Sequence, residues 1–170
     1  ALYYGRAGVP YFLHYLNSVR NIRSILGSLS IRPLLSIWFT RNVLLALPYL
    51  DALPLNDPIY QNTRRLALSA ANPFFYQGTA AEGIGGPHIG ADMIWPISLA
   101  MRGLTSTDNT EIRTCVQALK ATHAGTGYMH ESFHKDNPAK YTRAWFAWAN
   151  TLFGELILTV HQKHPRLLVK

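Results

Sequence analysis

The residues best suited to chemistry lie in the segment His130-Glu131-Ser132-Phe133-His134. Its two histidines and the glutamate after the first match the pattern H-E-x-x-H, in which one face of a helix presents both imidazoles to a zinc ion and the glutamate acts as general base. Glu155 follows at a spacing suited to a third zinc ligand. Taken alone, this segment predicts a zinc peptidase.

The residues around this segment argue against a zinc site. Gly125 and Gly127 lie just upstream and Pro138 just downstream, which leaves room for only a short helix around the two histidines. Lys135 also stands where the helix of such peptidases is usually apolar. We therefore expect no metal and no cofactor, and keep the zinc peptidase as a minor alternative.

Two other features give a weaker chemical signal. The stretch from Gly83 to Gly90 is rich in glycine, but no strand signal precedes it and no Lys-Ser/Thr pair follows it, so a tight loop explains it as well as a phosphate-binding loop. Cys115, the only cysteine, lies on the apolar face of a predicted helix. It is expected in the core and not as a nucleophile.

The segment from Gly125 to Trp148 mixes aromatic and hydrogen-bonding side chains, which is typical of a sugar site. Aromatic faces can stack on the C–H face of a pyranose ring, while His, Asn, Arg and carboxylate groups bind its hydroxyls. Trp145 and Trp148 are equally well explained as core residues. Composition alone leaves both interpretations open.

The composition describes one globular domain and excludes several classes of protein. The chain has 170 residues, of which 48% are hydrophobic and 15% charged, with a net charge of +7. Residues 1–50 contain five arginines and no acid, but these arginines are scattered among leucines and isoleucines and do not form a basic aromatic face, so we expect no nucleic-acid partner. We also expect no membrane span, because no run of 18 apolar residues is free of charge and proline.

Capping and breaking residues predict helices joined by long loops. Asp57 before Pro58 predicts a helix that runs through Ala70. The stretch from Ile94 to Arg102 has helical composition, and Gly103 is expected to end that helix.

The second half of the chain gives similar signals. Asp108 and Glu111 resemble a capping box that opens a helix to His123, and residues 125–141 are expected to form a long loop. Thr142 can cap a last helix from Arg143 to about Lys163, with an apolar stripe formed by Trp145, Trp148, Leu152, Leu156 and Val160. No alternating strand pattern appears, so the predicted class is all-α.

Seven motifs occur in order between Leu44 and Thr159. They are Leu47-Pro48-Tyr49-Leu50, Asn56-Asp57-Pro58-Ile59-Tyr60-Gln61-Asn62-Thr63-Arg64, Gly83-Ile84-Gly85-x-Pro87-His88, Ile94-Trp95-Pro96-Ile97, Leu99-Ala100-Met101-x-Gly103-Leu104-Thr105-Ser106, Gly125-Thr126-Gly127-Tyr128-Met129-His130-Glu131-Ser132-Phe133 and Trp145-Phe146-Ala147-Trp148-Ala149-Asn150. Together they resemble the C-terminal part of glycoside hydrolase family 125.

Members of that family are exo-acting α-1,6-mannosidases that are metal-independent, invert configuration and fold as an (α/α)6 toroid. The resemblance therefore implies the incomplete C-terminal part of an all-α toroid. It also implies an α-mannoside oligosaccharide, or mannose derived from N-glycans, as the substrate, and no cofactor.

The resemblance assigns roles to single residues. Glu131 matches the family's general base, which activates water on the face of the anomeric carbon opposite the leaving group. His130 and His134 are then expected to bind sugar hydroxyls or to orient the base, and Glu155 to be structural. Four further residues in matched motifs are expected to line the mannose subsite: His88, Trp95, Arg143 and Trp145.

This chain departs from the family pattern in two places. The family's general acid lies far upstream, in a paired-aspartate motif after Arg-Pro-Ser, and no acid precedes Asp51 here. The family also tends to show a second aspartate pair followed by Ala-Asn just before the position of Leu44, where this chain reads Phe39-Thr40-Arg41-Asn42. We interpret residues 1–43 as an unmatched, non-native start and residues 44–170 as a partial catalytic domain.

Because an inverting glycosidase needs both an acid and a base, we expect this chain to be inactive by itself. The main alternative is a non-catalytic sugar-binding or helical interaction module that keeps the pocket without the chemistry.

Overall fold

A computed structural model of the chain describes residues 44–168, so the non-native start inferred for residues 1–43 lies outside the described residues. The helices are α3 (Pro58–Ala67), α4 (Pro96–Leu104), α5 (Asn109–Ala121) and α6 (Ala147–Lys163), with 3-10 turns at Pro87–Ile89 and Pro165–Leu167. The strands are β1 (Phe75–Gln77), β2 (Glu82–Ile84), β3 (Met93–Ile94), β4 (Ser132–His134) and β5 (Asn137–Thr142). The described residues are thus helix-rich with small antiparallel sheets.

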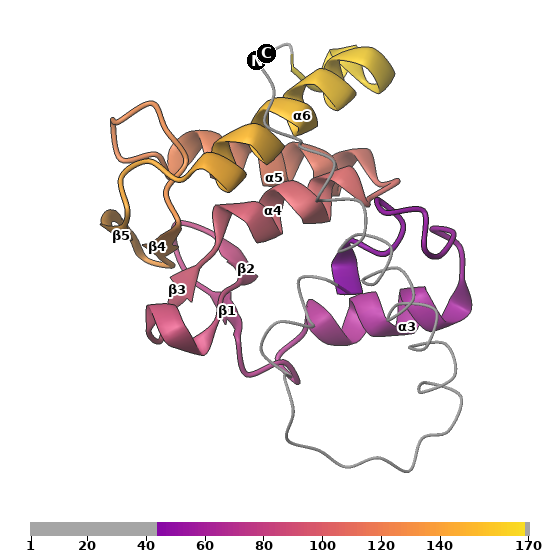
Figure 1. Ribbon diagram of the computed structural model, residues 1–170, viewed down its shortest axis with the longest axis horizontal. Helices are drawn as coiled ribbons and strands as arrows, with labels where there is room; N and C mark the ends of the chain where they lie inside the picture. The colour runs from indigo at the N-terminus through magenta and orange to yellow at the C-terminus, as the bar shows by residue number, and fades with distance from the viewer. Residues whose placement is uncertain (1–43, 169–170) are drawn as a thin grey trace, which may run out of the picture.

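Helix α4 packs against both α5 and α6, whereas α5 and α6 contact each other little; the three helices lie together in Figure 1. Gly103 of α4 permits the close approach, because a Cβ there would lie 3.0 Å from Leu156 Cδ1 of α6 and 3.4 Å from Cys115 Cβ of α5. The core between these helices includes Leu99, Leu119 and Leu156, each at most 2% exposed. Within residues 44–168, no helix is long and apolar enough to cross a membrane.

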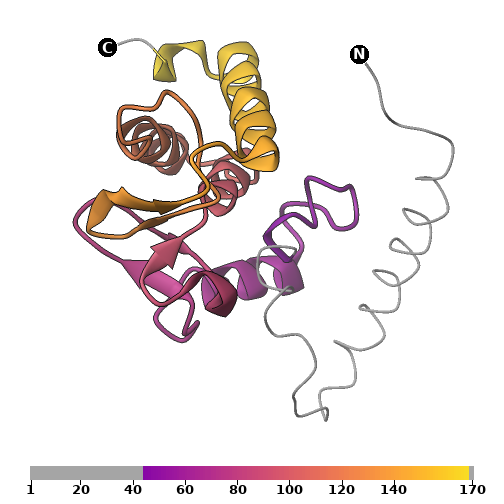
Figure 2. The same cartoon turned by 60° about the vertical axis from the view of Figure 1, so that its left-hand side comes forward.

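The strands gather at one end of the helical layer in both views (Figures 1 and 2). Strands β1 and β2 form one antiparallel hairpin, and β3, β4 and β5 form a second antiparallel sheet in that order. In the second sheet Ile94 pairs with Phe133 and Phe133 with Tyr141. Phe133 is fully buried in the core, so this sheet is attached to the helices through its central strand.

The helix starts that depend on local capping are confirmed. The Asp57 Oδ1 accepts hydrogen bonds from the amides of Ile59 and Tyr60, and Pro58 occupies the first turn of α3. Asp108 caps α5 by accepting a hydrogen bond from the Thr110 amide at 2.8 Å. The ends differ from the predictions: α3 stops at Ala67, before Ala70, and α5 stops at Ala121, before His123.

The all-α prediction is correct only in part, because two predicted loops contain strands. The glycine-rich stretch 83–90 contributes to β2 and a 3-10 turn, and the predicted loop 125–141 contains β4 and most of β5. Thr142 pairs with Ser132 at the end of β5 and does not cap α6, which begins at Ala147. The strands are only two to six residues long, so they carry no alternating pattern and depend on distant partners. The described residues do not show a toroid.

Glu111 joins three helices instead of completing a capping box. Its carboxylate binds Arg64 of α3 at 2.7 Å and Arg102 of α4 at 2.7 Å. Arg102 also binds Glu82 of β2 at 2.9 Å. Burial alone would raise the pKa of Glu111, but hydrogen bonds from Ser106 and Arg102 and the charges of both arginines outweigh it and hold that pKa below its usual value.

The turns of the two hairpins contact each other. The Lys135 carbonyl, in the β4–β5 turn, accepts hydrogen bonds from the amides of Ala80 and Ala81 in the β1–β2 turn. The Thr79 amide donates to Asp136 Oδ1 at 2.8 Å. Gly78 is required for this approach, because a Cβ there would lie 2.5 Å from the Lys135 carbonyl oxygen.

We predict that Glu111→Gln destabilises the fold at neutral pH by about 2–4 kcal/mol, because it removes the carboxylate between two largely buried arginines. A carboxyl whose pKa is lowered by folding contributes stability above its unfolded pKa, and this contribution is lost as the pH falls through the folded value. The difference in the free energy of unfolding between the variant and the wild-type chain should therefore shrink below about pH 4. Urea unfolding of both proteins at pH 7 and pH 3.5 measures this difference.

Glu82→Gln serves as the control, since the Glu82 side chain is 38% exposed and, among the arginines of residues 44–168, forms an ion pair with Arg102 alone. Glu82→Gln should lower the free energy of unfolding less than Glu111→Gln does at both pH values. An equal loss for the two variants would contradict a central role for Glu111.

Candidate functional site

Glu131, the predicted base, lies just before β4, and Arg143 lies just after β5. The β4–β5 pairing therefore places them side by side, and Arg143 Nε lies 3.3 Å from Glu131 Oε2. The Glu131 side chain is 18% exposed and that of Arg143 67% exposed. The Glu131 side chain is thus largely enclosed, contacts one cation and keeps some exposure to solvent.

Arg143 has an unusual backbone conformation. Its φ is +43°, in the left-handed region that a non-glycine residue rarely adopts. Its guanidinium carbon lies 5.7 Å from the centre of the Phe146 ring, which is a cation–π distance. The surrounding structure therefore imposes the strained backbone at the residue that contacts the predicted base.

His130 turns away from solvent and is fully buried. Its Nδ1 donates a hydrogen bond to the Ala144 carbonyl at 2.8 Å, since a carbonyl can only accept. Its ring stacks on Tyr141 with the centroids 3.8 Å apart. Nε2 has no hydrogen-bond partner among the described residues. The ring therefore ties the residue before Glu131 to the chain that follows β5.

His134 lies at the turn end of β4, where its Nδ1 accepts a hydrogen bond from the Asp136 amide at 3.2 Å. No residue of the H-E-x-x-H segment is helical: Ser132–His134 form β4, and Glu131 lies at a bend just before it. Residues 44–168 contain no group of three His, Cys, Asp or Glu residues arranged to hold a metal. The helical geometry on which the zinc-peptidase alternative depends is therefore not formed.

His88 and Trp95 form a second group of predicted site residues. Their ring centroids lie 5.4 Å apart, and His88 is exposed on its 3-10 turn. A Cβ at Gly86 would lie 2.4 Å from Trp95 Cη2, so this glycine lets the backbone pass directly against the indole ring. This close contact explains why the glycine-rich stretch forms a tight loop.

The predicted stripe on the last helix divides into two parts. Leu156 and Val160 are buried in the core, whereas Trp145 is 59% exposed and Trp148 is 70% exposed. Trp148 contacts Phe146 edge to face, with the centroids 5.7 Å apart. Two exposed indoles thus follow Arg143 closely in the chain.

Cys115 and Glu155 are the remaining residues considered for chemistry, and each is packed or hydrogen-bonded within the fold. Cys115 is 1% exposed, and burial raises the pKa of its thiol to about 12, so its expected place in the core is confirmed. Glu155 is half-buried and accepts a hydrogen bond from the Tyr49 hydroxyl at 2.8 Å.

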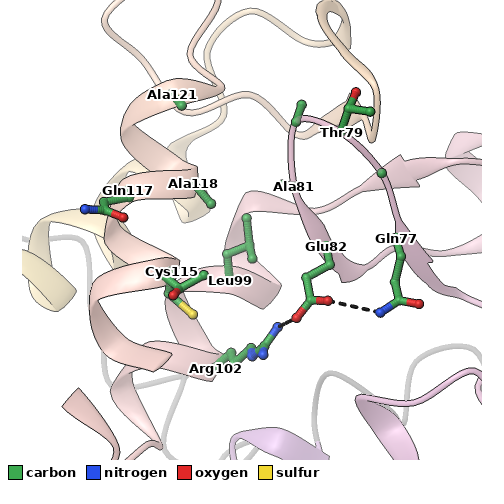
Figure 3. Close-up of a pocket in the computed structure, with 13 residues that line it drawn as sticks. Gln77, Thr79, Ala81, Glu82, Leu99, Arg102, Cys115, Gln117, Ala118 and Ala121 are labelled. Atoms are coloured by element: carbon green, nitrogen blue, oxygen red, sulfur yellow. Dashed lines mark hydrogen bonds and ion pairs between the residues drawn. The ribbon is translucent and has the colours of Figure 1, made fainter. Parts of the chain in front are cut away.

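Two described cavities lie away from the predicted base. One, of about 400 Å³, lies between α5 and the β1–β2 hairpin, and Figure 3 shows Arg102, Glu82 and Gln77 linked along one side of it. The other, of about 250 Å³, is lined by residues of α3 and by the segment from Thr105 to Glu111. No predicted site residue lines either cavity.

Sequence reasoning missed Tyr141 and Asn150, which hold the backbone beside Glu131. Tyr141 stacks on His130, and the Asn150 side chain binds both backbone groups of Met129. Asn150 ends the motif Trp145-Phe146-Ala147-Trp148-Ala149-Asn150, but a contact across 21 residues leaves no periodic signal.

Comparison with known proteins adds a family and two relatives. Residues 42–158 match the family described as metal-independent alpha-mannosidase (GH125). A Schizosaccharomyces pombe protein called Meiotically up-regulated gene 157 protein is 48% identical over 128 residues, which cover 75% of this chain and 25% of the relative.

A Streptococcus pneumoniae protein, solved as a non-productive substrate complex with alpha-1,6-mannobiose and described among metal-independent alpha mannosidases, is 48% identical, with a TM-score of 0.69. The match covers 71% of this chain and 28% of that protein. The chain thus spans about a quarter of the length of these two relatives.

We predict that the purified chain carries well under one zinc ion per molecule and keeps its melting temperature and circular dichroism after dialysis against a chelator. The reason is that the H-E-x-x-H segment is not helical, with His130 fully buried and His134 at the turn end of β4, so the helix face that would present both imidazoles to one ion is not formed. Atomic absorption and thermal unfolding measure this. Stoichiometric zinc that is lost in His130→Ala or His134→Ala would show that the prediction is wrong.

Proposed function

Because the chain belongs to the GH125 family of metal-independent alpha-mannosidases, we propose that it carries the general base and part of the sugar site of an inverting, exo-acting α-1,6-mannosidase. Its substrate would be a terminal α-mannoside, including mannose residues of N-glycans. The observation that carries the proposal is the enclosed Glu131 carboxylate, held at 3.3 Å by Arg143 within the matched segment.

In this mechanism the Glu131 carboxylate accepts a proton from a water molecule that attacks the anomeric carbon opposite the leaving group. Inverting glycosidases place the acid about 6.5–9.5 Å from the base, so that this water fits between them. The Glu131 side chain is 18% exposed, so it is not closed off from water.

The other predicted residues would bind the sugar around this base. Trp95 and Trp145 offer indole faces, and His88 and Arg143 offer hydrogen-bond donors for hydroxyl groups; all four have exposed or half-buried side chains. His134 remains a candidate for a hydroxyl contact. His130 is fully buried, and its role would be to orient the base.

The general acid of the reaction would come from a part of the catalytic domain that precedes the matched segment. Residues 44–168 would then supply one half of the chemistry, and the chain alone would not protonate the leaving oxygen. The nucleotide sequence upstream of Leu44, read in all three frames, should encode the two missing aspartate motifs. Their absence there would contradict the interpretation of residues 1–43 as a non-native start.

We predict that Glu131→Gln lowers the hydrolysis of an activated aryl α-mannoside by this chain roughly 100-fold, with substrate binding retained, because the amide keeps the shape of the side chain and removes its basicity. A dinitrophenyl leaving group needs little proton assistance, so this substrate reports on the base alone. Steady-state kinetics measure the loss.

Glu155→Gln is the matched control, since it changes a half-buried carboxylate on α6 that binds Tyr49. It should leave the rate unchanged. An unaffected rate in Glu131→Gln, with a loss in Glu155→Gln, would move the base to Glu155.

We also predict that the chain does not hydrolyse α-1,6-mannobiose, whose leaving group requires an acid. Release of free mannose, followed by chromatography, is the measurement. Turnover at a rate above that of Glu131→Gln would show that an acid resides within this chain. Asp92, which binds Lys135 at 2.9 Å, and Asp57, which caps α3, would then be the residues to replace.

A further inference from the structure

The side chain of Asn150 holds the backbone that leads into Glu131. Its Oδ1 accepts a hydrogen bond from the Met129 amide at 3.0 Å, and its Nδ2 donates one to the Met129 carbonyl at 2.8 Å. A single primary amide thus satisfies both backbone groups of the residue two positions before Glu131. Met129 itself is 4% exposed, so these backbone groups have little access to water.

Asn150 is an unusual residue for its place in α6. Asparagine is among the less favourable residues in a helix, because its side chain competes for backbone hydrogen bonds. Here Nδ2 also donates to the Phe146 carbonyl at 2.8 Å, and the Phe146 amide donates to the Met129 carbonyl at 3.1 Å. The start of α6 and the segment before Glu131 are therefore joined by one connected set of hydrogen bonds.

Three consecutive residues are tied in this way to the chain that follows β4. Met129 is bound by Asn150, His130 by the Ala144 carbonyl, and Glu131 donates its amide proton to the Thr142 carbonyl at 3.2 Å. The last two bonds lie within the hairpin and the chain that leaves it. Asn150, together with the Phe146 amide, provides the attachment to α6, whose Leu156 and Val160 are buried in the core.

We propose that Asn150 is a positioning residue for Glu131: it fixes the backbone of Met129 against α6 and thereby sets where the Glu131 carboxylate stands relative to Arg143. The functional part of this inference rests on the proposed role of Glu131 as general base. A catalytic group must be held within about 0.5 Å of its productive position, and two hydrogen bonds to one peptide unit provide such a constraint. Without them, the hydrogen bond from the Phe146 amide to the Met129 carbonyl still links this segment to the start of α6, but the Met129 amide loses its acceptor.

Carbon-13 labelling of glutamate tests the positioning without any need for activity. The chain has four glutamates, Glu82, Glu111, Glu131 and Glu155, and the signal of Glu131 is assigned as the one missing from Glu131→Gln. Asn150→Ala should shift or broaden the Glu131 carboxyl signal and speed the hydrogen exchange of the Met129 amide at least 10-fold. The signals of Glu82 and Glu111 should not move.

Thr151→Ala is the matched control, because Thr151 is the next residue on α6 and its hydroxyl donates to the Ala147 carbonyl of its own helix. It should leave all four signals in place. Asn150→Asp, which keeps the shape and the acceptor for the Met129 amide but has no donor for the Met129 carbonyl, serves if Asn150→Ala does not fold. An unmoved Glu131 signal in the Asn150 variants, or equal movement of all four signals, would overturn the inference.

Hydrolysis of dinitrophenyl α-mannoside connects the inference to function. Asn150→Ala should lower kcat roughly 10-fold to 100-fold and leave KM nearly unchanged, since the variant displaces the base and does not touch the sugar. If Glu131→Gln does not lower the rate, the proposed function is wrong, while the glutamate signals still decide whether Asn150 positions residue 131. If Glu131→Gln lowers kcat and Asn150→Ala does not, the positioning role is wrong and the proposed function stands.

Discussion

The antiparallel pairing of β4 with β5 is the constraint on which the candidate site depends. Glu131 and Arg143 stand at the open end of this hairpin, and the Glu131 amide donates to the carbonyls of both Thr142 and Arg143. The contact between carboxylate and guanidinium follows from this register. A shift of one residue would turn every side chain of the strand to the opposite face and separate the pair.

The hairpin in turn is held at three places by elements of different kinds. Its central residue Phe133 is buried in the helical core and pairs with Ile94 of β3. Its turn is bound by the turn between β1 and β2 through the Lys135 carbonyl. Its open end is attached to α6 through Asn150. The ion pairs of Glu111 join α3, α4 and α5, and Arg102 also binds Glu82 of β2. The helices are thus connected to the β1–β2 hairpin, whose turn binds the β4–β5 turn.

The sequence predicts the elements whose signals are local and misses those that depend on distant partners. Asp57 and Asp108 cap their helices because the carboxylate reaches amides two or three residues away, and such contacts can be inferred from a few letters. The β4–β5 hairpin has no such signal, since its register also depends on β3 and on a bulge between Phe133 and His134. The family resemblance assigns both Glu131 and Arg143 to the site. Their contact with each other could not be predicted without the β4–β5 pairing. The hydrogen bonds of Asn150 could not be predicted without the position of α6 in the fold.

The same five residues, His130 to His134, would do different chemistry on a different backbone. On a helix, residues four apart lie on one face, and both imidazoles could bind a single metal ion beside the glutamate. Here His130 is drawn inward by the Ala144 carbonyl and Tyr141, and His134 stands at the turn end of β4, beside Asp136. Between them, the Glu131 carboxylate meets a cation and solvent instead of a metal site. The backbone conformation, more than the residue types, therefore decides that the helical zinc ligand set is not formed, which agrees with the proposed role of Glu131 as a base.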